Sequence, residues 1–203
     1  MGLPLQPDLQ PWTPWQSRTL LVAGLVAAVL VLGFLAAARR TPPTLLATRG
    51  LPGTADYLGT VERLITGARR RVWLVMFVIR YDEGGSAHAL LQALAEAAAR
   101  GVRVQVALDS GKEWNSSQVS DKHVAPAAWL RAHGVQVVID EIDRTTHAKT
   151  LVVDDRQVVI GSHNWTHSAL LQNRELSLAV DDPRLAAEVA AEIRRIPGWN
   201  SDY

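Results

Sequence analysis

The chain has 203 residues, of which 48% are hydrophobic, so it is long enough for one domain with a substantial core and too short for two full domains. Lysine and arginine total 21 against 20 aspartate and glutamate, which excludes a global charge bias toward polyanions and leaves only local basic patches for that role. Cysteine is absent, which excludes disulfides and thiolate metal sites.

A long apolar segment lies near the amino terminus. Residues 19–38 carry no charge, and arginines at positions 18, 39 and 40 flank them. A helix of this length rises about 30 Å, the thickness of a bilayer core, so the segment predicts a single transmembrane helix behind a short tail, residues 1–18. Two alternatives stay open, namely a cleaved signal peptide with an A-x-A pattern at its end and a helix buried in a soluble domain.

The same arginines predict the orientation of the chain. Arg18 precedes the predicted span, whereas Arg39, Arg40 and Arg49 follow it, and the positive-inside rule then puts the carboxyl-terminal domain in the cytoplasm. An extracytoplasmic domain is the alternative, because the amino-terminal tail is short and weakly charged. Residues 39–53 are rich in proline and predict an extended linker.

Downstream of the linker, apolar patterns of helical period alternate with patterns typical of strands. Thr54 and Ser86 are expected to cap or begin helices, Gly101 to end one, and Pro183 to stand in the first turn of the last. Predicted helices cover residues 54–68, 86–101, 125–134 and 182–196, and predicted strands cover residues 71–79, 102–109, 135–139, 147–153, 158–164 and 175–180.

This alternation predicts the fold class. We expect one α/β domain, residues 54–199, with a mostly parallel sheet and helices on both of its faces. The sequence contains no internal repeat. Each motif is therefore present once per chain.

One stretch, THAKTLVVDDRQVVIGSHNWT at residues 146–166, combines a predicted hairpin with an unusual set of polar residues. Strand geometry puts alternate residues on one side, about 7 Å apart. A four-residue turn from Asp154 to Gln157 would pair His147 with Asn164 and Lys149 with Ser162, so that these four side chains share one face. Leu151, Val153, Val158 and Ile160 would continue that face as apolar packing.

Such a cluster is suited to an anionic oxygen centre beside a titratable imidazole. Lysine supplies a positive charge, serine and asparagine supply neutral donors, and histidine can attack or transfer protons near neutral pH. On spacing alone, polar residues at a solvated sheet end remain the alternative.

The pattern H-x-K, four residues, D, six residues, G-S-x-N resembles the signature of the phospholipase D superfamily. His147, Lys149, Asp154, Ser162 and Asn164 meet it, and the sequences GSHNWT and NREL that follow are similar to that family as well. The resemblance covers the chain from about residue 54 to residue 199.

This resemblance implies a phosphodiesterase that needs no metal and no cofactor. In the family, one histidine attacks phosphorus to give a phosphohistidine and a second protonates the leaving alcohol, after which water or another alcohol resolves the intermediate. Two motifs meet at one site, so a chain with a single motif implies a homodimer in which each subunit contributes His147, Lys149, Ser162 and Asn164. The resemblance assigns Glu175 as the carboxylate that bonds the histidine ring. Asp154 is expected to brace the hairpin.

Three other sequence features could bind a metal ion, a lipid or a substrate. His163 and His167 have a spacing that would suit a metal only on a helix, and we expect no metal there. The basic run at residues 68–71 is expected to be a solvated helix end rather than a lipid or phosphate contact. The polar segment from residue 111 to residue 123 follows a predicted strand and is the candidate for substrate contact.

The substrate remains open between three hypotheses. Cleavage or head-group exchange on membrane phospholipids is favoured, because an anchor would hold the site close to lipid. An endonuclease acting on DNA or RNA is the first alternative, and it should show a basic groove and strong salt dependence. A catalytically inactive membrane-tethered scaffold is the second.

Overall fold

The computed structural model describes residues 14–38, 41–50, 54–110, 121–141 and 143–200. The chain divides into two compact units, residues 1–40 and residues 41–203.

The described residues of the first unit form the helix α1 (Pro14–Ala38). Its described apolar side chains, such as Leu21, Leu25 and Leu32, are exposed. In the described part of the chain, no helix combines the length and the apolarity that crossing a membrane requires. The predicted span ends at residue 38, and the side chains of residues 34–38 lie outside that description.

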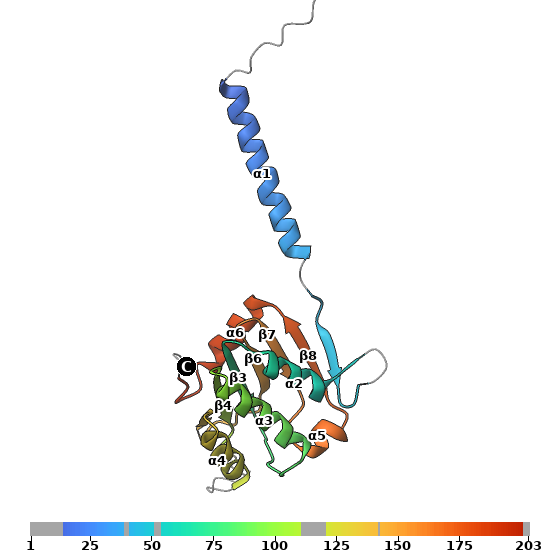
Figure 1. The fold of residues 1–203 in the computed structure, drawn as a ribbon, viewed down its shortest axis with the longest axis vertical. Helices are drawn as coiled ribbons and strands as arrows, with labels where there is room; N and C mark the ends of the chain where they lie inside the picture. The colour runs from blue at the N-terminus through green and yellow to red at the C-terminus, as the bar shows by residue number, and fades with distance from the viewer. Residues whose placement is uncertain (1–13, 39–40, 51–53, 111–120, 142, 201–203) are drawn as a thin grey trace, which may run out of the picture. The chain divides into compact units, whose positions relative to one another are not determined.

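An eight-stranded sheet forms the centre of the second unit, with the strand order β2-β1-β8-β7-β6-β3-β4-β5. Figure 1 shows its central strands side by side. The strands are β1 (Thr44–Ala47), β2 (Ala55–Asp56), β3 (Arg71–Met76), β4 (Arg103–Leu108), β5 (Gln136–Ile139), β6 (Lys149–Val153), β7 (Gln157–Gly161) and β8 (Leu176–Asp181).

The prediction of a mostly parallel sheet is wrong. Only β1 with β2, β3 with β4 and β4 with β5 are parallel, while the pairs β1–β8, β3–β6, β6–β7 and β7–β8 are antiparallel. Parallel neighbours need a crossover, which helices supply only between β3 and β5. The chain turns back directly after β6, so the motif region lies in the antiparallel part of a mixed sheet.

Helices cover both faces of the sheet, as predicted. On one face lie α2 and α3 (Figure 1). Their buried side chains pack over strand residues such as Leu74 and Val106. On the other, α6 packs over Trp73 and Val152. The helices are α2 (Tyr57–Gly67), α3 (Ser86–Ala99), the 3-10 helix η1 (Asp121–His123), α4 (Val124–Ala132), α5 (His167–Leu171) and α6 (Pro183–Ile193).

The folded unit begins upstream of the predicted domain boundary. Residues 44–47, expected within a linker, form β1 and pair with β8. Leu46 is fully buried in the core below α2, which explains why this short segment is held in the sheet. The cap of α2 also differs from the prediction, because the Asp56 carboxylate, and not Thr54, accepts the Gly59 N–H at 2.7 Å.

The hairpin exists, but its register differs by one residue from the predicted one. Thr150 pairs with Ile160 and Val152 with Val158, across a three-residue turn in which Asp154 and Asp155 have φ of 52° and 59°. Two residues in the left-handed region make an odd-length turn possible. Val158 therefore lies on the α6 side of the sheet, and the predicted apolar face shared with Leu151 is wrong. The predicted pairing of His147 with Asn164 and of Lys149 with Ser162 is wrong for the same reason, because it requires the register that the hairpin does not have.

Candidate active site

The polar segments of the motif lie along one edge of the sheet, which is formed by the ends of its central strands. β3 and β7 end there, while β6 and β8 begin there, because β6 is antiparallel to both β3 and β7 and because β8 is antiparallel to β7. β4 is parallel to β3 and ends at the same edge. Residues far apart in the sequence, near positions 77, 109, 147, 162 and 175, thereby lie along one edge.

His147 and Lys149 contact one another at this edge. Lys149 Nζ lies 3.1 Å from His147 Nδ1 and 3.2 Å from Nε2, and it donates a hydrogen bond of 2.7 Å to the His147 carbonyl oxygen. The ring of Phe77, the residue after β3, lies 4.3 Å from the His147 ring, centroid to centroid, and 4.8 Å from Lys149 Nζ. An imidazole and an ammonium group are thus held together beside one aromatic ring.

Burial acts on the charge of Lys149. Its side chain is only 7% exposed, and this desolvation lowers the pKa of Lys149 from its ordinary value, while the negative charge of Glu175 acts in the opposite direction. Lys122 of η1 approaches the same Phe77 ring at 4.7 Å. Lys122 Nζ also lies 3.8 Å from Asp109 Oδ2, which balances part of its charge. The ammonium group of Lys149 beside the His147 ring favours an anion such as a phosphate at this edge.

Ser162 and Glu175 form a second contact, between the end of β7 and the start of β8. Ser162 Oγ donates to Glu175 Oε2 at 2.5 Å and accepts the Leu176 N–H at 3.1 Å. The other carboxylate oxygen accepts from Asn173 Nδ2 at 3.0 Å. This differs from the expected bond to the His147 ring, since no hydrogen bond within the described residues joins Glu175 to His147. The effect of Glu175 on Lys149 is electrostatic, because its negative charge raises the pKa of Lys149.

Gly161 makes the close approach of β7 and β8 possible. A Cβ added there would lie 2.1 Å from Ser177 Oγ and 2.4 Å from both the Leu176 carbonyl oxygen and Ser177 Cα. Two of these atoms belong to backbone and cannot rotate away. The glycine of the motif is therefore a steric requirement for holding Ser162 next to β8.

Asn164 lies just beyond these residues, between Ser162 and the buried Trp165. Backbone bonds from Trp165 N to Val78 O and from Arg80 N to Trp165 O fix this segment against the chain after β3. The Asn164 Oδ1 atom is buried and accepts no hydrogen bond from the described residues. A buried acceptor of this kind has a free energy penalty unless a donor reaches it.

Two residues that the sequence did not single out hold the segment in front of His147. Asp109, which follows β4, accepts the Thr146 N–H at 2.9 Å through Oδ1, and Asp140 accepts from the Thr146 hydroxyl. His123 Nδ1 lies 2.6 Å from the Asp109 carbonyl oxygen, and burial lowers the pKa of His123. These contacts orient the backbone that carries the imidazole. Knowledge of the strand order, which aligns the ends of β3 and β4, could have identified Asp109.

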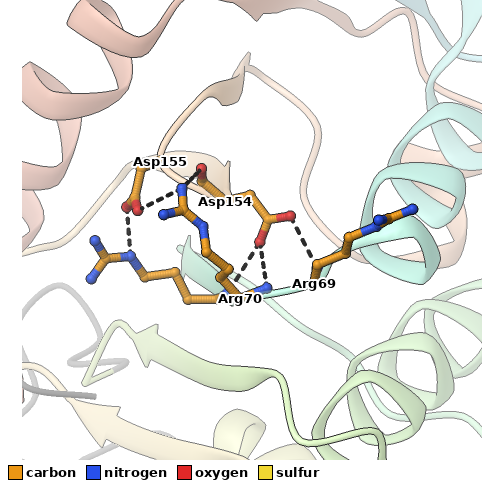
Figure 2. A network of polar contacts seen from close by, with 5 residues as sticks. Arg69, Arg70, Asp154 and Asp155 are labelled. Atoms are coloured by element: carbon orange, nitrogen blue, oxygen red, sulfur yellow. Dashed lines mark hydrogen bonds and ion pairs between the residues drawn. The ribbon is translucent and has the colours of Figure 1, made fainter.

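Asp154 lies at the far end of the hairpin from His147. Its carboxylate accepts the backbone N–H groups of Arg69 at 3.0 Å, Arg70 at 2.8 Å and Arg71 at 3.1 Å, as Figure 2 shows for its labelled residues. Asp155 pairs with the Arg70 and Arg71 guanidinium groups at 3.3 and 2.5 Å. The basic run at residues 68–71 thus binds the hairpin turn.

His163, between Ser162 and Asn164, is fully buried. Its ring stacks on Tyr57 at 3.9 Å, Nδ1 lies 2.8 Å from Ser177 Oγ, and Nε2 lies 3.2 Å from Thr48 Oγ1. His167 begins α5 and is exposed. No cluster of metal-binding side chains occurs among the residues described. Most of the predicted substrate loop, residues 111–120, lies outside the described residues.

Comparisons with known proteins identify relatives of this chain. A family model described as cardiolipin synthase, PLD-like domain, matches residues 61–197. The mitochondrial cardiolipin hydrolase of Homo sapiens is 32% identical over 148 residues, which cover 72% of this chain and 53% of that protein. A phospholipase D of Rickettsia bellii is 31% identical over 104 residues, or 51% of this chain and 48% of that protein. The chain thus spans about half the length of these relatives.

Solved structures show the same fold. Nuc from Salmonella typhimurium, described as a phospholipase D family member, superposes with a TM-score of 0.59 at 20% identity over 74% of this chain and 90% of its own. NucT from Helicobacter pylori superposes with a TM-score of 0.59 at 20% identity. The match covers 76% of this chain and 94% of NucT. The family model and the human relative together show that this chain belongs to the phospholipase D superfamily.

Proposed function

We propose that this protein is a phosphodiesterase that cleaves membrane phospholipids through a covalent phosphohistidine at His147. The observation that carries the proposal is the contact of His147 with Lys149, at 3.1 and 3.2 Å, in a chain of the phospholipase D superfamily. His147 is exposed and can reach a substrate, whereas Lys149 is buried beneath it.

The roles of the residues follow from their chemistry. A ring nitrogen of His147 attacks phosphorus, and the bond from phosphorus to the head-group oxygen breaks. Lys149 holds a positive charge against the phosphoryl oxygens, and Asn164 and Ser162 supply neutral polar groups. Glu175 balances the charge of Lys149 and positions Ser162. Water then attacks the phosphohistidine and releases phosphatidic acid. No step requires a metal ion.

A proton must reach the leaving head-group oxygen, and one chain carries one His147. We therefore assign the acid to His147 of a second copy, in a homodimer with a shared site. Exposed apolar side chains support a second copy beside the site. Ile160, Leu178 and Leu45 are directly opposite one another in the register of β7, β8 and β1, and they are 44%, 43% and 41% exposed.

The names of the relatives support a phospholipid substrate. Proteins called cardiolipin hydrolase and phospholipase D match this chain at 31 to 32% identity. In the described basic run, Arg70 and Arg71 are paired with Asp155. These charges are partly neutralised, which favours a lipid over a polyanionic strand.

We also infer that residues 19–38 attach the catalytic domain to a bilayer, with the domain on the cytoplasmic side. The support is the uncharged sequence of this segment and the arginines that follow it. Extraction of membranes with alkaline carbonate and protease protection in sealed vesicles test attachment and side separately. Release by carbonate would refute the anchor without affecting the proposed chemistry.

The activity is tested with the purified full chain in EDTA. Vesicles of phosphatidylcholine, phosphatidylglycerol and cardiolipin are assayed beside single-stranded and duplex nucleic acid, with His147→Ala as the control. Release of phosphatidic acid that is lost in His147→Ala supports the proposal. Cleavage of nucleic acid alone identifies an endonuclease, and the absence of all cleavage indicates a scaffold.

A further inference from the structure

A cavity of about 680 Å³ lies between α6, the sheet and the segment that leads into β6. Its apolar lining includes the strand residues Val75 and Ile160 and the α6 residues Val189 and Ile193. Ile196, which follows α6, lines it as well. His147 also belongs to the lining, so the cavity and the candidate active site share a wall.

Apart from His147, the residues to which the proposed chemistry assigns a role do not line the cavity. Lys149, Ser162 and Glu175 do not line it. The charged groups among its lining have both signs, and one pair, Glu192 and Arg195, forms an ion pair at 3.2 Å. Asp140, Glu141 and Arg144 also line the cavity, so its charges have both signs and do not favour a polyanion. Its apolar side chains offer a surface on which an uncharged, flexible hydrocarbon can bind.

We propose that this cavity binds an aliphatic chain of the lipid whose phosphate lies at His147. The inference rests on the proposed phospholipid activity and adds to it the place where the substrate's apolar part binds. The volume falls within the range of roughly 300–1,000 Å³ that is typical of small-molecule pockets. Because His147 lies in the wall, a lipid can place its phosphate at the imidazole while a chain enters the cavity.

If the cavity binds an aliphatic chain of the substrate, activity depends on the length of that acyl chain. Each methylene that enters the cavity is removed from water, and kcat/KM should rise about fourfold per methylene, the factor that corresponds to about 0.8 kcal/mol. The increase should end when the cavity is full. A site that contacts only the phosphate and head group would show no such dependence beyond partition into detergent.

The test places a large side chain in the cavity by substitution of a residue on α6. Val189 is half-buried and lines it, whereas Ala191 is exposed on the same helix and does not. Val189→Trp is therefore compared with the matched control Ala191→Trp. Pro197→Trp is a second filling variant, because Pro197 lines the cavity and is exposed, so that folding tolerates the larger side chain.

The full chain, at a constant concentration of nonionic detergent, is assayed on phosphatidylglycerols with acyl chains of increasing length. The ratio of variant to wild-type kcat/KM cancels the effect of partition into micelles. For Val189→Trp and Pro197→Trp, this ratio should stay near one for the shortest chains and fall about tenfold or more for the longest. For Ala191→Trp it should stay near one throughout.

Three results would overturn the inference. A ratio that is independent of chain length, in a wild type that cleaves these lipids, removes the cavity from the substrate site but leaves the proposed function intact. An equal loss on all lipids together with a changed oligomeric state, measured by light scattering, assigns the cavity to contact between copies of the chain. A wild type that cleaves none of the lipids refutes the proposed function and, with it, this subsite.

Discussion

Protonation of His163 should destabilise the fold between pH 6.5 and pH 4. The ring is fully buried, and burial lowers its pKa from 6.5 to about 4, although the negative charges of Glu175 and Asp56 act in the opposite direction. The hydrogen bonds require the neutral ring. Thr48 Oγ1 donates to the Ala169 carbonyl oxygen at 3.0 Å and so accepts from Nε2, which leaves Nδ1 to accept from Ser177.

The sign and the magnitude follow from this difference in pKa. Below pH 6.5 the unfolded chain binds a proton at His163 that the folded chain does not, so the free energy of unfolding falls as the pH falls toward 4. Between pH 7 and pH 5 the loss from this one residue is about 2 kcal/mol, and by pH 4 it approaches about 3 kcal/mol, at 1.36 kcal/mol for each pH unit.

The measurement compares wild type with His163→Gln in urea, with tryptophan fluorescence as the probe and the same detergent throughout. Glutamine offers one donor and one acceptor without a titration in this range. The decrease in the free energy of unfolding from pH 7 to pH 5 should be about 2 kcal/mol smaller in His163→Gln. Equal decreases in the two proteins would show that His163 is not buried as a neutral ring, which would refute the reasoning.

Three further substitutions separate steric, structural and catalytic roles. Gly161→Ala should lower the free energy of unfolding by about 1–3 kcal/mol, because the new Cβ meets β8 backbone at 2.4 Å; an unchanged urea midpoint would contradict this. Asp154→Ala removes the acceptor of three N–H groups and should destabilise by about 2–3 kcal/mol, while kcat per folded molecule stays within about tenfold; a loss as large as that of His147→Ala would show that it acts at phosphorus. Lys149→Gln should lower kcat about 10²–10³-fold without unfolding the chain, and wild-type kcat would remove Lys149 from the mechanism.

The local elements of the fold were accessible from the sequence because they depend on short-range patterns. The buried run of β3, the helical period of α3 and the two strands around Asp154 each have a signal within one window of residues. β1 was not predicted, because a segment of four residues that follows two prolines is too short to show a hydrophobic period. Its place in the sheet depends on Leu46 filling the core below α2.

The hairpin register was wrong for a specific reason. The turn contains no glycine, and a pattern with Asp154, Asp155 and Arg156 does not reveal that both aspartates adopt positive φ. The structure supplies the reason why Asp154 can do so, since its carboxylate binds three N–H groups from the segment before β3. Such contacts between distant segments are invisible to local patterns.

The same limit applies to the candidate site. His147 and Lys149 were found because their motif is contiguous, whereas Phe77 and Asp109 belong to other strands and become neighbours only through the strand order. The prediction of a mostly parallel sheet did not give this strand order. Once β6 is known to be antiparallel to β3, the residue after Met76 is expected next to the start of β6.

The most direct test of the central claim is to trap the covalent intermediate. The full chain is mixed with an ether-linked phosphatidylglycerol in EDTA and quenched within a turnover in alkali, which preserves phosphohistidine and does not cleave the ether-linked chains. The protein is then digested for mass spectrometry. The account predicts a phosphatidyl group on the imidazole in the peptide that contains His147, and its absence in His147→Ala. Phosphatidic acid formed by wild type with no adduct at His147, or an adduct on another residue, would contradict it.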